Sequence, residues 1–165
     1  MKKLGLVLTV MVALAGVAYA SSLAIPWFVD NADAGAGWPP AAKNTTLIYL
    51  KNNTEDVLVA EITYFSAEGA NLGPEYPANT FAIDPKASVA FRPVVADPIG
   101  ALPGGTLLGL EGAAGIAIPD RPVDVDPKSN GSATISWTGG PTDLQGMLAT
   151  TSMALSYAHL LPPGT

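Results

Sequence analysis

The run Thr46–Gly69, TLIYLKNNTEDVLVAEITYFSAEG, decides the fold class. Two stretches rich in β-branched and aromatic residues, 46–50 and 57–65, lie on either side of a cluster of turn formers at 52–56. From Val59 onward polar and apolar residues alternate, and in a strand this alternation separates them onto opposite faces. The run therefore predicts a β-hairpin with one buried face.

Short strands continue on both sides of this run, at the spacing of about 8–12 residues typical of all-β domains. The expected strands cover 25–29, 79–83, 88–92, 132–137, 144–149 and 152–160, and those at 79–83, 88–92 and 132–137 end at a turn signal or proline. A helix over 144–159 is the alternative for the last pair, but Thr150, Thr151 and Ser152 disfavour it. We expect an all-β fold, a single antiparallel β-sandwich with long loops rich in proline and glycine; the immunoglobulin-like type is implied by the resemblance described below.

Two segments interrupt the strand rhythm, 30–42 and 94–131, and both are rich in proline and glycine. We expect long loops there, with poorly patterned strands in part of the second segment. The expected organisation is a signal peptide over 1–20, an extended N-terminal segment over 21–43 and the sandwich over 44–165.

The first twenty residues have the three parts of a secretory signal peptide. Lys2 and Lys3 precede an apolar stretch over 4–17, and Ala18-Tyr19-Ala20 offers small residues before Ser21. The apolar stretch is shorter than the roughly 20 residues that span a bilayer, and no cysteine follows for a lipid anchor. We expect a bacterial protein that is secreted to the cell surface or medium, with the periplasm and an uncleaved anchor as alternatives.

Charge and cysteine content narrow the function. Cleavage would leave six of the eight basic residues against fourteen acidic ones, a balance that repels nucleic acid and anionic lipid. The chain contains no cysteine, so disulfides and thiol chemistry are excluded. An exported protein of this kind depends on its core, on bound ions or on assembly. We expect no nucleic-acid partner and no membrane insertion after cleavage.

A cluster of aspartates offers a candidate calcium site. Asp120, Asp124 and Asp126 lie close together, and an extended backbone would point the last two the same way. Calcium prefers such oxygen ligands, although the spacing does not match an EF-hand loop. A solvated acidic turn, partly neutralised by Arg121 and Lys128, is the alternative. A second, weaker cluster covers 30–33.

Aromatic residues offer a candidate carbohydrate site. Trp38 lies among glycines and prolines and is expected to be exposed, whereas Trp137 ends an alternating strand and is expected in the core. Trp27 is expected to pack near a sheet edge. An exposed tryptophan on a secreted sandwich is a candidate sugar-stacking group.

Catalytic patterns are missing from the sequence. His159 is the only histidine, too few for a zinc site without several carboxylates, and no Gly-x-Ser-x-Gly elbow accompanies it. We therefore expect a protein that is not an enzyme and has no cofactor apart from the calcium considered above.

The run Thr46–Gly69 resembles the opening hairpin of bacterial immunoglobulin-like or fibronectin-like extracellular sandwiches. This resemblance implies an adhesion, matrix or appendage module without catalytic residues. We expect a secreted structural or assembly protein, such as a subunit of an extracellular filament, surface layer or matrix. Its partner would be a further copy of the chain or another extracellular protein, and a calcium- or carbohydrate-binding module is the alternative.

Overall fold

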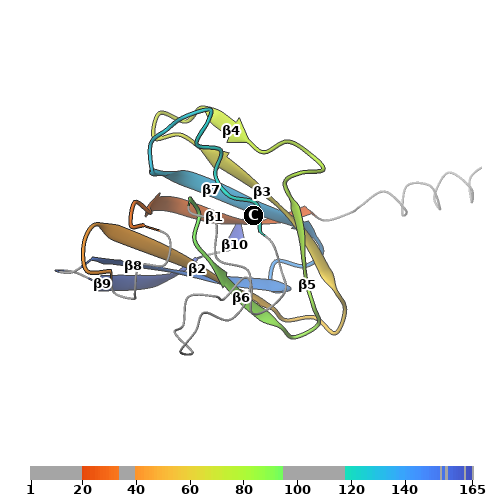
Figure 1. Ribbon diagram of the computed structural model, residues 1–165. Coiled ribbons are helices and arrows are strands. Elements are labelled where there is room, and N and C mark those ends of the chain that lie inside the picture. The colour runs from red at the N-terminus through yellow and green to blue at the C-terminus, as the bar shows by residue number, and fades with distance from the viewer. Residues whose placement is uncertain are drawn as a thin grey trace, which may run out of the picture.

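The computed structural model describes residues 20–33, 40–94, 118–152, 154, 156–161 and 163–164. Ten strands form two antiparallel sheets in this part of the chain, and the sheets face each other as the two layers of a sandwich (Figure 1). The predicted all-β class is confirmed. Among the described residues, no helix has the length and apolarity needed to cross a membrane.

The first sheet, sheet A, has a central path of five strands, and a sixth strand, β5, pairs with β3 beside it. Along that path the order is β10 (Pro163–Gly164), β1 (Ala20–Val29), β7 (Asn130–Thr138), β3 (Leu58–Phe65) and β4 (Asn71–Gly73), and β5 covers Thr80–Ile83. The sheet thus includes residues 20–29, which we expected largely in the segment before the sandwich.

The second sheet, sheet B, has four strands, in the order β6 (Ser88–Phe91), β2 (Asn44–Asn52), β8 (Leu144–Ser152) and β9 (Ser156–Leu161). The expected closing pair of strands is confirmed, because β8 and β9 are neighbours with a continuous register from Gly146↔Leu161 to Thr151↔Ser156. The helical alternative for this region is wrong.

The predicted hairpin over Thr46–Gly69 is also wrong. Its two strands exist, but β2 pairs with β6 and β8 in sheet B, whereas β3 pairs with β4, β5 and β7 in sheet A. The turn at 53–57 therefore crosses from one sheet to the other, and the loop at 84–87 crosses back beside it. Alternation along a strand reports which face is buried, but it does not report the neighbour to which the strand bonds.

Asn52 joins these two crossing loops. Its side chain is fully buried, and Nδ2 donates to the backbone carbonyls of Asp56, Ile83 and Asp84 at 2.8–3.0 Å. Its Oδ1 accepts from the backbone N–H and the hydroxyl of Thr54, both at 2.8 Å. A residue predicted as part of a turn is therefore the buried polar centre of the corner between the two sheets.

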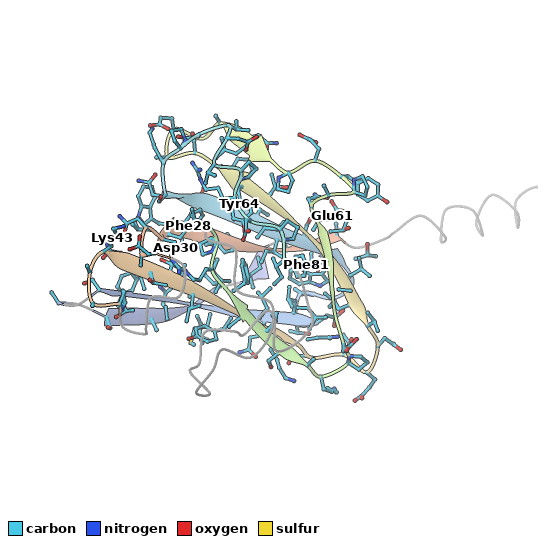
Figure 2. The ribbon with its side chains drawn as sticks, viewed as in Figure 1. Phe28, Asp30, Lys43, Glu61, Tyr64 and Phe81 are labelled. Atoms are coloured by element: carbon cyan, nitrogen blue, oxygen red, sulfur yellow. The ribbon has the colours of Figure 1, made fainter. Side chains whose placement is uncertain are left out.

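The core fills the space between the two sheets. Phe28 and Tyr64 meet edge to face with ring centroids 6.0 Å apart, and the Tyr64 hydroxyl donates to the carbonyl of Pro119 at 2.8 Å (Figure 2). Trp137 is buried as expected, and its indole N–H donates to the carbonyl of Gly140 at 3.0 Å. Tyr64 and Trp137 therefore bury their rings in the core while their polar hydrogens remain hydrogen-bonded.

An ion pair is buried at the end of the core where β1 and β6 finish. Asp30 and Arg92 have side chains only 0% and 3% exposed, and Arg92 Nη2 lies 2.5 Å from Asp30 Oδ1. The same guanidinium donates to the carbonyls of Ala32 and Asp33, and the backbone N–H of Asp30 donates to Ser129. The ion pair therefore connects the two sheets, because Asp30 directly follows β1 of sheet A and Arg92 directly follows β6 of sheet B.

Gly146 marks a close approach of the two sheets. A Cβ at this position would lie 2.8 Å from Cδ2 of Leu23 on β1 and 3.1 Å from Cδ1 of Leu161 on β9. We predict that Gly146→Val lowers the free energy of unfolding by about 1–3 kcal/mol, because the added methyl groups overpack this contact. Gln145→Val is the matched control, since Gln145 is exposed on the opposite face of the same strand. Urea unfolding at equal midpoints for the two variants would contradict the prediction.

Candidate functional site

The outer face of sheet B carries an apolar surface. The hydroxyl of Thr46 on β2 donates to the carbonyl of Val29 on β1 of the opposite sheet, so the even-numbered residues of β2 point inward and the odd-numbered ones outward. Residues that pair across antiparallel strands share a face, which extends this assignment to the other strands of sheet B. Two rows of outward residues then cross the sheet, here called the outer rows. The first consists of Ala90, Tyr49, Met147 and Leu160, and the second of Leu47, Ala149 and Ala158.

Exposure of the outer rows increases toward β9. Ala90 and Leu47 are buried, Tyr49 and Met147 are half-buried, and Leu160 is 66% exposed. Burial raises the pKa of the Tyr49 hydroxyl, which keeps this group uncharged over a wider range of pH. The accessible apolar surface is therefore concentrated over β8 and β9.

Two grooves flank Leu160. One has a volume of about 450 Å³, and its lining includes Tyr49, Lys51, Met147 and Leu160. The other has a volume of about 430 Å³ and is lined by Asn53, Pro141, Thr142, Leu144, Gln145, Gly146, Leu160 and Leu161. Leu160 thus lines both hollows.

The strand β9 is exposed on both faces. Ser156 through Leu160 are five consecutive exposed residues, so the strand extends beyond the cover of sheet A. On its inner face the rings of Tyr157 and His159 are parallel within 1°, with centroids 6.3 Å apart. His159 is therefore an exposed residue of an edge strand, beside a tyrosine.

The described sheet edges differ in their protection against pairing with another chain. The outermost strand of sheet A beside β1 is β10, which has two residues and pairs only with Ser22 and Leu23. Beyond these residues β1 contains Pro26 and an irregular register between Ile25 and Phe28, and β4, β5 and β6 have only three or four residues. Prolines, bulges and short strands are the usual means of blocking an edge. The strand β9 has six residues without proline or charge, and no described strand pairs with its far side.

The predicted calcium ligands do not form one cluster in the described structure. Asp126 accepts from Nη2 of buried Arg121 at 2.8 Å and from the backbone N–H of Lys128 at 3.1 Å. Residues 123–125 form a turn instead of the extended segment that would align the carboxylates, and Asp124 is exposed. Asp120 is half-buried. The described residues contain no group of three acidic or histidine side chains suited to a metal ion.

The weaker aspartate cluster is also divided. Asp30 is buried in its ion pair with Arg92, whereas Asp33 is exposed and bonds to Nζ of Lys43 at 2.7 Å. This hydrogen bond to Lys43 lowers the pKa of the Asp33 carboxyl. The two carboxylates therefore have separate cationic partners.

The candidate sugar-binding residue, Trp38, lies outside the described residues. Of the other two tryptophans, Trp137 is buried and Trp27 is 42% exposed on β1. The described structure therefore places no pair of exposed tryptophans on one surface.

A further hollow of about 530 Å³ lies on the outer face of sheet A. Carboxylates of Asp56, Glu61 and Asp143 line it together with exposed Val57 and Val59. Asp143 accepts from the backbone N–H of Gly140 at 2.7 Å, so it shapes the local turn. The sequence did not reveal this hollow, because β3 and β7 become neighbours only in the folded sheet.

Comparisons with protein-family models, curated proteins and solved structures found no match to this chain. The class of the protein is therefore defined by its fold, an all-β sandwich of two antiparallel sheets.

Proposed function

We propose that this chain is a secreted, non-catalytic structural protein that assembles with further copies of itself through sheet B. The observation that carries the proposal is the edge strand β9, which has six residues, no charge, no proline and five exposed residues in a row. An open edge of this kind bonds readily to an added strand, because its backbone donors and acceptors already have strand geometry.

The outer rows also favour sheet B as the surface through which copies contact each other. Leu160, Met147 and Tyr49 are apolar or uncharged, although the chain as a whole has a net charge of −6. Covering these residues removes apolar area from water without desolvating a charge. A cysteine-free exported protein also gains stability from assembly, since binding of copies to the folded state shifts the folding equilibrium.

Secretion is part of the proposal, and the N-terminal pattern supports it. Lys2 and Lys3, the apolar stretch over 4–17 and the small residues before Ser21 are the features of a cleavable signal peptide. A filament, surface layer or matrix outside the cell is the assembly that we propose.

The test is the size of residues 21–165 in solution, measured by light scattering and negative-stain microscopy. We predict oligomers or regular particles whose size is the same with calcium and with a chelator. Leu160→Lys should shift the population toward the monomer, because it places a charge in the contact. The matched control is Val59→Lys, which changes an equally exposed apolar residue on sheet A and should leave the size unaltered. A monodisperse monomer across the micromolar range would reject the proposal.

A further inference from the structure

We infer that two copies of the chain pair antiparallel through β9 about a two-fold axis at His159, joining two four-stranded sheets into one of eight strands. The inference rests on the proposed function and specifies its first contact: the partner, a second copy, and the register. Because a two-fold contact closes on itself, growth of such pairs into a filament, layer or matrix uses a second surface. Its basis is the unprotected edge of β9 together with the positions of the outer rows.

A two-fold axis restricts the possible registers. Antiparallel pairing of β9 with its own copy is an isologous contact, in which both copies use the same residues. The axis is perpendicular to the joined sheet, so the outer faces of both copies lie on the same side of it. An outward residue of β9 can therefore pair only with an outward residue of the other copy, and an inward residue only with an inward one. Two registers keep five residues of each strand in contact, one centred at Ala158 and the other at His159.

The register centred at His159 continues the outer rows into the second copy. It places Leu160 opposite Ala158 of the other copy, so Met147 and Leu160 of one chain lead directly into Ala158 and Ala149 of the next. Exposed Leu160 then has an apolar neighbour on each side, Met147 of its own chain and Ala158 of the second copy. On the inner face, Tyr157 lies opposite Leu161 of the second copy.

The register centred at Ala158 is less favourable. It places Leu160 opposite Ser156 of the other copy, and the Ser156 hydroxyl is already hydrogen-bonded to Thr151 within its own chain. The apolar row would then end against a polar pair. Cross-strand pairs of matched character stabilise a sheet, so the structure assigns the His159 register.

The absence of cysteine allows a direct test of this register. In antiparallel sheets, directly opposite Cα atoms lie about 4.5–5.5 Å apart, within the range that a disulfide bridges. We expect His159→Cys to form a reducible dimer under mild oxidation at least about tenfold faster than Ala158→Cys, the matched control one residue away. Faster cross-linking of Ala158→Cys would overturn the assignment in favour of the other register.

A second measurement does not depend on replacing His159. Mixed single-cysteine chains carrying Ala158→Cys and Leu160→Cys should cross-link to each other, whereas Leu160→Cys mixed with Ser156→Cys should not. If the unmodified protein forms oligomers and neither expected cross-link appears, pairing through β9 is wrong and the proposed assembly uses another surface. If the unmodified protein is monomeric, the proposed function itself fails. Circular dichroism of each variant confirms that the fold is retained.

Discussion

Arg92→Met is expected to lower the free energy of unfolding by about 3–5 kcal/mol, because it leaves the carboxylate of Asp30 buried without its cation. Arg92 donates to Asp30 through Nε at 2.9 Å and Nη2 at 2.5 Å, and its remaining donors reach two backbone carbonyls. The substitution keeps most of the aliphatic volume and removes every one of these donors. Chemical unfolding monitored by tryptophan fluorescence measures the loss.

Two further variants separate the buried charge from the loss of packing. The double variant Asp30→Asn with Arg92→Met leaves no unpaired charge and should recover part of the lost stability. Lys128→Met breaks the exposed ion pair with Glu68 and should leave the unfolding midpoint almost unchanged. An Arg92→Met midpoint close to that of Lys128→Met would show that the buried pair contributes little.

The existence of most strands was predictable from the sequence, because it depends on local alternation. The strands at 58–65, 130–138 and 144–152 alternate between buried and more exposed positions over most of their length. In the strand at 130–138 the polar residues mark the outer face and the apolar residues mark the core, whereas the strand at 144–152 also places apolar Met147 and Ala149 on its outer face. The fold class follows from the number of such strands and the turns between them.

Strand pairing was not predictable in the same way. The β2 and β3 segments have the strand composition and intervening turn formers of a hairpin, yet they bond in different sheets. The decisive contacts join Asn52 to Ile83 and Asp84, more than thirty positions away. Such contacts depend on where a distant loop lies, and no local pattern encodes that position.

For the candidate site too, the residue types could be read from the sequence, whereas their contacts with residues on other strands could not. The aspartates at 120–126 are visible in the sequence, but the burial of Arg121 against Asp126 appears only in the folded chain. The outer rows likewise combine residues from β2, β6, β8 and β9, whose register fixes their proximity. One local signal for β9 was available, the absence of charge and proline over 156–161.

Asn52→Ala is expected to lower the free energy of unfolding by about 3 kcal/mol, since buried carbonyls lose their donor when the amide is removed. Those carbonyls belong to Ile83, Asp84 and Asp56, so the loss affects both loops that cross between the sheets. Asn53→Ala is the matched control, because the neighbouring amide makes a single exposed bond to Thr142. We expect this control to change stability by less than about 0.5 kcal/mol.

Asn52→Asp tests whether donation by the amide is the stabilising feature. The carboxylate has nearly the shape of the amide but cannot donate, and its burial raises the carboxyl pKa in the folded state above the value of about 3.9 in the unfolded chain. The destabilisation caused by ionising this buried carboxyl is therefore absent below the unfolded pKa, and it reaches its full size as the pH rises through the folded pKa. Relative to Asn52→Ala, the Asp variant should therefore be less stable at neutral pH and should recover as the pH falls toward 4. If both variants unfold at the same midpoint at every pH, the corner does not depend on a buried donor.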